Sequence, residues 1–492
     1  MQKYSKIIAL FLIFLIFLVF SCNSSHSSND SDIVPDEDID SDDIETQDDD
    51  SDVQHPEIAD DLDKTSDSDD SNSEETSYCE EDEEDFDDED VITSYTRCYD
   101  EIPDEPYEGF FADKKLESQI KKNLGYDSDH ELTEEDLEKI TEITVDLSKD
   151  IRGVEKLVNL EYVLILTGKI YDYTPLSQLK KLKKLRIHAE SMTCLDGSFS
   201  LLTNLETLEI VETKLTDVSP VEQLVNLKSL DLLENHIEFL PKNIGNLQQL
   251  EFLAFSHNNV QDITPLKSLT NLKKLFFHYN YIEDVSPIKC LVNLTRLGVQ
   301  GNQIKDIAPV TNLVNLTYLG LNENQIKDIP KEIINLKKLQ DLELKFNNVS
   351  NLPNLTGLDS LVIMEISFND LSDENVMKLD ALESVKFLYI TSNKRISKVP
   401  IMKNLKSLQE LYLNYNSITD LAGFADNESF PALKRLDIGS NKIDDVEAFR
   451  NRKGLSSLYV DKNCIKDFSP LEELQERGTY VGGMHEQLES CE

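Results

Sequence analysis

One motif recurs along most of the chain, and its period restricts the fold more than any other feature. Leucines stand three and two residues apart before an Asn, as in Leu224-Val-Asn-Leu227-Lys-Ser-Leu230-Asp-Leu232-Leu-Glu-Asn235-His-Ile237. The second Leu recurs, with one Val, at positions 160, 182, 205, 227, 250, 272, 294, 316, 339, 361, 385, 408, 433 and 455. Most steps are 22 or 23 residues. Such a period predicts a solenoid in which every repeat stacks on its neighbours.

The residue types of the motif predict a strand followed by a turn. Leucines spaced by two residues send alternate side chains of a short strand into a core. The Asn follows where the chain leaves the strand, and its amide both donates and accepts hydrogen bonds. We therefore expect it to satisfy backbone groups that the turn leaves unpaired.

These residues resemble leucine-rich repeats, from about Leu157 to Leu474. Segments such as Ile263-Thr-Pro265-Leu266 and Val285-Ser-Pro287-Ile288 resemble the 22-residue class shared by internalins and phosphatase-regulatory repeat proteins. The resemblance implies an α/β repeat fold, a leucine-rich-repeat solenoid shaped as a horseshoe with a concave parallel β-sheet. It also implies recognition of a protein partner.

Two short helices are expected before the repeats. Apolar residues from Phe111 to Leu124 have helical spacing and Gly125 follows them. Thr133 is a suitable N-cap for a second helix that runs to Ile140. This segment resembles the helical N-terminal cap of internalin-like proteins.

The first 106 residues have a different character. Lys3 and Lys6 precede an apolar run of 14 residues, 7–20. The end of this run and the two residues after it read Val-Phe-Ser-Cys22, which resembles the lipobox of bacterial lipoproteins. Between residues 23 and 106 there are 36 acidic and two basic residues, so this segment carries most of the net charge of −47. It is too acidic and too poor in apolar residues to form a core. The domains expected are a lipoprotein signal peptide at 1–21, an acidic disordered tether at 22–106, a helical N-terminal cap at 107–156, leucine-rich repeats at 157–474 and a C-terminal cap or tail at 475–492.

Cysteine placement suggests two disulfides. Lipidation of Cys22 leaves six further cysteines in an oxidising compartment. Cys464 and Cys491 are at the C-terminal end, where a disulfide would close the last repeat, and Cys79 with Cys98 is a second candidate pair.

Catalytic and metal-binding motifs are not found in the sequence. It contains no GxSxG, HExxH, GxGxxG or Walker-type loop. His257 and His278 are expected on adjacent strands, but no third metal ligand accompanies them. We therefore expect no enzymatic activity, no cofactor and no metal, and the acidity excludes a broad nucleic-acid surface.

The concave face is the expected binding surface. The residues beside the core leucines point outward, and they include Ala254 and Ser256 as well as many rings. Clustered exposed rings are typical of interface anchors. The candidate partner-binding residues are Phe252, Phe276, His278, Tyr279, Tyr318, Phe387, Tyr389, Tyr412, Tyr415 and Tyr459.

The sequence leaves three hypotheses for the function. The first is a monomeric recognition or adhesion lipoprotein of the bacterial cell envelope, anchored to a membrane through Cys22, with the outer membrane or cell surface preferred. The second is an envelope spacer that binds another envelope component. The third is a regulatory protein similar to the phosphatase-regulatory repeat proteins.

Overall fold

The repeats form one continuous parallel sheet. The computed structural model describes residues 106–166, 170, 172–189 and 192–491. Within them, 16 strands pair in sequence order, each with the next. The strands are β1 Glu142–Val145, β2 Tyr162–Ile165, β3 Lys184–Ile187, β4 Thr207–Ile210, β5 Ser229–Asp231, β6 Phe252–Ala254, β7 Lys274–Phe276, β8 Arg296–Gly298, β9 Tyr318–Gly320, β10 Asp341–Glu343, β11 Ile363–Glu365, β12 Phe387–Tyr389, β13 Glu410–Tyr412, β14 Arg435–Asp437, β15 Ser457–Tyr459 and β16 Tyr480–Gly482.

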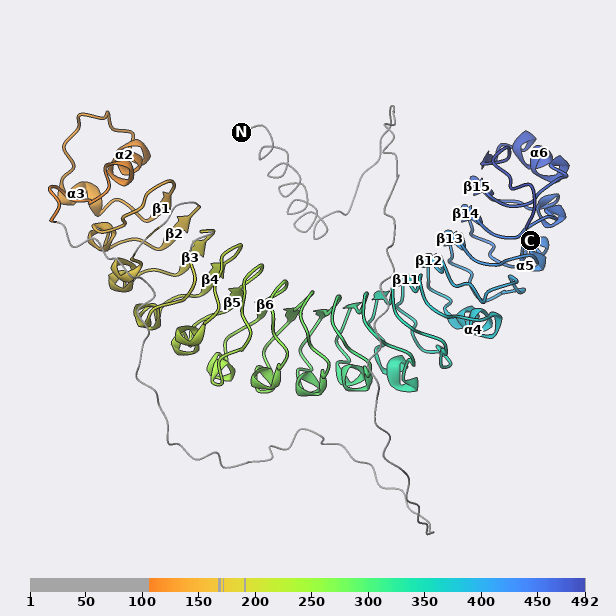
Figure 1. Ribbon diagram of the computed structural model, residues 1–492, viewed down its shortest axis with the longest axis horizontal. Coiled ribbons are helices and arrows are strands. Elements are labelled where there is room, and N and C mark those ends of the chain that lie inside the picture. Colours follow the sequence, from red (N-terminus) through yellow and green to blue (C-terminus); the bar gives the residue numbers. More distant parts are fainter. Residues whose placement is uncertain (1–105, 167–169, 171, 190–191, 492) are drawn as a thin grey trace, which may run out of the picture. The chain divides into compact units, whose positions relative to one another are not determined.

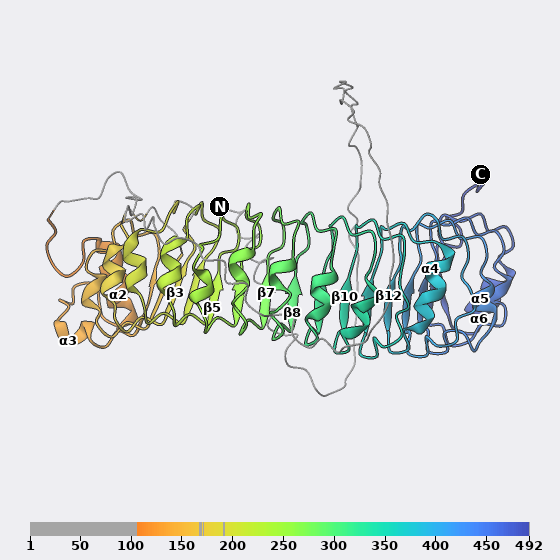
Figure 2. The same ribbon diagram turned by 90° about the horizontal axis from the view of Figure 1, so that it is seen from below.

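The repeat region curves, with the strands on its inner side and the short helices on its outer side (Figures 1 and 2). Most of the outer segments are single 3-10 turns, at Val154–Lys156, Thr174–Gln178, Gly197–Leu201, Ser219–Gln223, Ile244–Asn246, Thr264–Leu266, Ser286–Ile288, Ala308–Asn312, Lys331–Asn335, Leu379–Ala381 and Glu447–Phe449. Three outer segments are α-helical: α4 Asp373–Lys378, α5 Ala422–Ala425 and α6 Ser469–Glu476. Paired strands lie only about 4.8 Å apart, whereas helical segments need a wider spacing, so the strands line the concave face.

The register places the same motif position of every repeat side by side. Leu388 of β12 pairs with Met364 on one side and Leu411 on the other, and all three side chains are buried. The core is therefore a continuous stack of leucines and isoleucines, as expected for repeats that cannot bury their apolar faces alone.

The sheet is longer than the repeat count predicts. The sequence indicates 14 copies, but β1 lies in the segment predicted to be a helical cap and β16 lies in the predicted C-terminal tail. Both strands pair with their neighbours in the same parallel register. The motif was not recognisable there because Ile143 and Val481 replace leucine and the Asn is missing.

The motif Asn side chains form a buried hydrogen-bonded ladder, as predicted. Asn258 shows the pattern: its Oδ1 accepts the Ile237 N–H at 2.9 Å, and its Nδ2 donates to the carbonyls of Leu232 (2.9 Å) and Phe255 (3.0 Å). The amide thus joins one repeat to the preceding one. The residue before each Asn is usually in the left-handed region, for example Tyr279 with φ 51°.

Two helices precede the sheet, close to where the sequence predicts them. They are α2 Lys114–Asn123 and α3 Glu134–Leu137. Thr133 caps α3 in a capping box with Asp136, and Asp136 also accepts hydrogen bonds from Lys139 (2.8 Å) and Tyr126 (2.7 Å). These donors, Lys139 first, hold the pKa of Asp136 well below its usual range.

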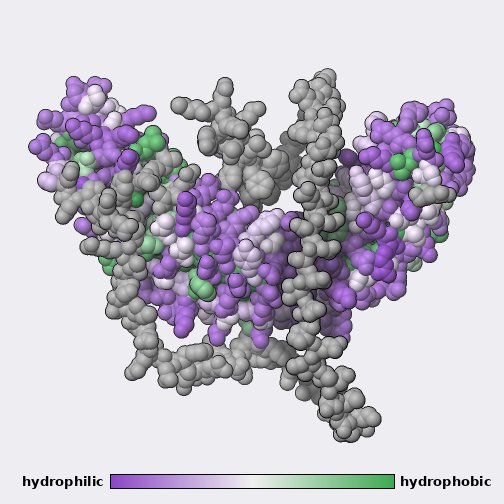
Figure 3. All heavy atoms as spheres, in the orientation of Figure 1, coloured by the Kyte–Doolittle hydropathy of each residue, from purple (hydrophilic) through white to green (hydrophobic). Residues whose placement is uncertain are grey.

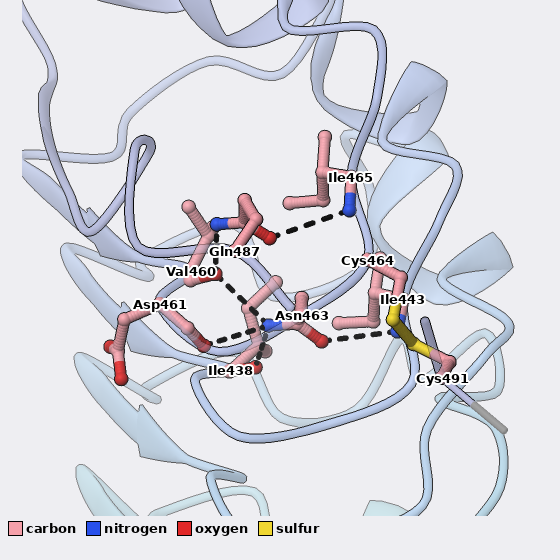
Figure 4. Close-up of a disulfide and its surroundings, with 9 residues drawn as sticks. All are labelled: Ile438, Ile443, Val460, Asp461, Asn463, Cys464, Ile465, Gln487 and Cys491. Atoms are coloured by element: carbon pink, nitrogen blue, oxygen red, sulfur yellow. Dashed lines mark hydrogen bonds between the residues drawn. A yellow bond between two sulfur atoms is a disulfide. The ribbon is translucent and has the colours of Figure 1, made fainter. Parts of the chain in front are cut away.

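A helix and a disulfide close the C-terminal end. Helix α6, Ser469–Glu476, precedes β16, and a disulfide joins Cys464 to Cys491 with Cα atoms 5.8 Å apart (Figure 4). Gln487 continues the Asn ladder, since its Nε2 donates to the carbonyl of Val460 at 3.0 Å. In the chain-entropy description, closing a loop of 27 residues contributes roughly 3 kcal/mol.

Of the remaining five cysteines, two lie in the part of the chain that the structure describes and three lie outside it. Cys194 and Cys290 are each disulfide-bonded. Cys22, Cys79 and Cys98 lie outside the described residues, as do the predicted signal peptide and nearly all of the predicted tether. Among the described helices, none has the length and apolar character needed to span a membrane.

Candidate binding surface

Two stacked tyrosines form the first cluster on the concave face. Tyr389 of β12 pairs in register with Tyr412 of β13, and their ring centroids lie 4.7 Å apart at an interplanar angle of 15°. Both rings are half-buried, and Tyr415 at the end of the next turn is 52% exposed. We call Tyr389 and Tyr412 the tyrosine stack. It offers a rigid ring surface whose side chains are already ordered.

The second cluster spans β6 to β7 and is flatter. The rings of Phe252 and Phe276 are 6.1 Å apart, and Phe276 lies 5.7 Å from His278. A Cβ on Gly298 of β8 would overlap the rings of both Phe276 and His278. These rings therefore lie down over the glycine, which explains why they are only half-exposed.

Ala254 and Ser256 do not face solvent, contrary to the register-based expectation. Their exposed fractions are 7% and 4%. Both side chains are short, and Ala254 is in register with the much larger Phe276 on β7. Ser256 is also held by a hydrogen bond, since its Oγ accepts the His278 N–H at 3.0 Å. A small side chain that points away from the core can thus still be inaccessible to solvent.

A row of exposed rings follows the positions just before the motif Asn. We define the aromatic ridge as Tyr279, Phe346, Phe368 and Tyr415, which are 37%, 44%, 38% and 52% exposed. Phe346 and Phe368 stack at 4.2 Å, and the Lys345 ammonium lies 5.1 Å from the Phe346 ring. Neither phenylalanine was among the residues predicted from the sequence. Their position before Asn347 and Asn369, equivalent to that of Tyr279 and Tyr415, was the available signal.

Charged side chains pair on the N-terminal part of the concave face. Glu209 of β4 accepts hydrogen bonds from Arg186 (2.6 Å) and His188 (2.9 Å) of β3. Asp231 on β5 is next in register to Glu209, and burial raises its pKa to about 6. This group neutralises itself internally and leaves little net charge for a partner.

The middle of the concave face is different, because no described residue forms an ion pair with the carboxylates there, and the Arg296 charge acts on Asp341 and Glu343 only from a longer distance. Asp341 and Glu343 lie on β10 and Glu365 on β11, and the described ion pairs include none of them. Burial and the neighbouring Glu343 charge raise the pKa of Asp341 to about 6. Burial likewise raises the pKa of Glu343. These carboxylates were not singled out from the sequence.

The two histidines considered for a metal site do lie near each other. Burial, followed by the neighbouring His257, lowers the pKa of His278 to about 4, so its imidazole is neutral at neutral pH. Tyr279 stacks on the other histidine, His257, at 4.6 Å. No group of three potential metal ligands occurs among the residues the structure describes. We therefore interpret His257 and His278 as part of the aromatic surface, where they contact Tyr279 and Phe276.

Comparison with known families agrees with the repeat geometry. A model described as "Leucine-rich repeat region" matches residues 293–476, and one described as "Leucine Rich repeats (2 copies)" matches residues 248–290. The chain is a leucine-rich-repeat protein. The repeated motif that places this chain in the family is thus the same motif that supplies the Asn ladder.

Solved structures of bacterial leucine-rich-repeat proteins are similar over most of the chain. An internalin from Listeria monocytogenes is 30% identical with a TM-score of 0.55, and the match covers 76% of this chain and 95% of that one. A leucine-rich-repeat protein of Leptospira interrogans is 26% identical with a TM-score of 0.63, covering 70% and 90% of the two chains.

Curated relatives match over shorter stretches. A homologue of the protein phosphatase 1 regulatory inhibitor subunit from Arabidopsis thaliana is 29% identical over 109 residues, which is 22% of this chain. Rat lumican is 34% identical over 108 residues. The chain spans about a third of the length of these relatives, 31% in both cases.

The leucine-rich-repeat solenoid brings some predicted site residues together and separates others. Tyr318 lies over Gly320 beside Arg296, whose guanidinium is 4.4 Å from the Tyr318 ring centroid. Tyr459, two strands from Tyr412, contacts Tyr480 at 5.8 Å. Phe387 is half-buried at the start of β12. Much of the remaining visible surface of the repeats is hydrophilic, with apolar side chains in small scattered groups (Figure 3).

Proposed function

We propose that this protein is a non-catalytic recognition module of the bacterial cell envelope, which binds a protein partner on the concave face of its leucine-rich repeats. The observation that carries the proposal is the concave surface itself. The tyrosine stack and the aromatic ridge place large, preordered rings on a face that the fold does not cover. Clustered rings of this kind supply most of the binding energy in many interfaces.

The leucine-rich-repeat family supports this proposal at a general level. Its members commonly serve as protein-interaction domains, and a bacterial internalin is similar along nearly its whole solved chain. The match to the phosphatase regulatory subunit covers 31% of that protein, so phosphatase regulation remains a secondary candidate. The signal-like N-terminus, with its lipobox at Cys22, favours the envelope over an intracellular phosphatase.

Photo-crosslinking in intact cells tests whether the concave face meets a partner. We expect p-benzoylphenylalanine in place of Tyr415, an exposed ring on the aromatic ridge, to capture a discrete protein. The matched control is the same replacement of Phe239, which is 78% exposed and lies between β5 and β6 outside both strands. Capture from position 239 with no capture from position 415 would place the recognition surface elsewhere.

The proposed membrane anchor gives a separate prediction. A diacylglyceryl group together with an amide-linked chain on Cys22 would hold the protein firmly in a membrane. We expect Cys22→Ala to move the protein from the detergent to the aqueous phase in a detergent partition, or to leave it as an unprocessed precursor. Cys79→Ala is the matched control and should partition as the wild type does. Wild-type partitioning of Cys22→Ala would refute the lipid anchor.

A further inference from the structure

The carboxylates at the centre of the concave face lie between two arginines that are already bound by tyrosines. On one side, the Arg296 guanidinium lies 4.4 Å from the Tyr318 ring. On the other side, the Arg435 guanidinium lies 5.5 Å from the Tyr412 ring and 5.0 Å from the Tyr459 ring. A planar guanidinium stacks well on such rings and pairs well with carboxylates. The solenoid thus shows twice, with its own side chains, how this face binds an arginine.

Between these two arginines, strands β10 to β12 have the same acceptors without a guanidinium. Glu365 of β11 is in register with Glu343 of β10 and with Tyr389 of β12. One oxygen of Glu365 accepts the Ser367 N–H at 2.9 Å, and Glu343 accepts hydrogen bonds from Asn322 (2.7 Å) and Tyr318 (3.3 Å). These contacts orient both carboxylates, and neither carboxylate forms an ion pair with a described residue.

The tyrosine stack leaves one ring face directed toward this gap. Tyr412 covers one face of Tyr389, with the planes 15° apart, so the other face of Tyr389 is turned toward the neighbouring Glu365 strand. Asp341, two residues before Glu343 on β10, has a buried Oδ1 that forms no hydrogen bond with any residue the structure describes. The nearby Lys345 does not fill the gap, because its ammonium lies over the Phe346 and Phe368 rings, at 5.1 and 5.4 Å.

From this arrangement we infer that Glu343, Glu365 and Tyr389 form a cation site that receives an arginine side chain of the partner protein. The guanidinium stacks on the open face of Tyr389 and pairs with the carboxylates of Glu365 and Glu343. The inference deepens the proposed function and rests on it, because it specifies the chemistry of the partner. A guanidinium is favoured over an ammonium because its planar fork can pair with two carboxylates while it stacks on a ring, and the arginines on both sides of the site already stack on tyrosines.

The raised carboxylate pKa values agree with such a site. A cation binds best when the carboxylates are ionised. Burial raises the pKa of Glu343, a carboxylate of the site, and burial with the Glu343 charge raises the pKa of the neighbouring Asp341 to about 6. Binding should therefore weaken between about pH 7.5 and about pH 5, whereas carboxylates of ordinary pKa, near 4, stay ionised at both. The charged groups around the site are Asp341, Lys345, Glu410, Arg296 and Arg435.

A defined peptide tests the cation site on the full-length protein. The probe is acetyl-(Gly-Arg)4-amide with a terminal p-benzoylphenylalanine, used at about 0.15 M salt to screen non-specific attraction. We expect adducts on peptides that contain β11 and β12, with yields about tenfold above those of the neutral citrulline analogue. Glu365→Gln should lower this yield about fivefold or more, while Glu283→Gln, an exposed carboxylate outside the strands, should not. Far-UV circular dichroism checks that both variants fold.

Each outcome decides between the inference and the function on which it rests. Adducts confined to residues 23–106, or a yield that Glu365→Gln leaves unchanged, would overturn the cation site. A partner captured from position 415 whose crosslinked segment contains no arginine would also overturn it, while the proposed function would stand. Adducts at β11 and β12 without any captured partner would retain the cation site and remove the proposed function.

Discussion

Asn393→Ala is expected to destabilise strands β11 to β13 by about 3 kcal/mol, because it leaves several buried backbone groups without hydrogen bonds. The Asn393 side chain is fully buried. Its Oδ1 accepts the Leu371 N–H at 3.0 Å, and its Nδ2 donates to the carbonyls of Ile366 (3.1 Å) and Thr391 (3.2 Å). Alanine replaces none of these contacts, and the site is too closed for water to do so.

Native-state hydrogen exchange measures this loss where it occurs. Each repeat contacts only its neighbours, so the protection of amides in β11 to β13 should fall by about a hundredfold while β2 to β5 change little. The matched control is Asn312→Ala, the same change on an exposed side chain of the convex side, for which an effect within about 0.5 kcal/mol is expected. Equal effects of the two substitutions would show that the Asn ladder contributes no special stability.

The fold was predictable because one short pattern repeats with little variation. Leucine spacing gives the strand direction, and the Asn after it identifies the turn, so register follows for every copy that keeps the motif. Where the motif is degenerate, as at Ile143 and Val481, the same physics still adds a strand, β1 or β16. A stacked neighbour supplies the pairing and the burial there, and neither is visible in the sequence of a single repeat.

The candidate surface was predictable in outline only. Register identifies the outward positions, and the tyrosine stack follows from Tyr389 and Tyr412 occupying equivalent places. Register does not indicate how far a side chain rises above the sheet. Phe276 bends over Gly298 because the glycine leaves space, and Ala254 is covered because its neighbours are large. Accessibility therefore depends on the sizes of side chains in adjacent repeats.

The repeat motif did not predict which charged side chains on the concave face form ion pairs. Glu209 is neutralised by Arg186 from the preceding strand, whereas Glu365 has no basic neighbour in either adjacent repeat at the same position. Residues that lie 20 to 25 positions apart in the sequence become direct neighbours in the sheet. Only the assembled ladder shows which carboxylates are paired and which are available.

Replacing both rings of the tyrosine stack is expected to weaken partner binding by at least about tenfold, because rings at the centre of an interface typically contribute about 2 kcal/mol or more each. Tyr389→Ala with Tyr412→Ala removes two half-buried rings that stand on the concave face outside the leucine core. The measurement is the affinity of the double variant for the partner captured from position 415, with titration by calorimetry. The fold should be retained, since the core beneath these rings is made by other side chains.

Leu388→Ala separates loss of binding from loss of structure. Leu388 directly precedes Tyr389 on β12 and is fully buried, so its truncation should destabilise the repeats by about 2 to 5 kcal/mol. The double tyrosine variant should instead unfold in urea close to the wild type while binding poorly. A folded double variant with wild-type affinity would exclude the tyrosine stack as an anchor. The aromatic ridge around Phe346 and Phe368, which the double substitution leaves intact, would then be the next surface to truncate.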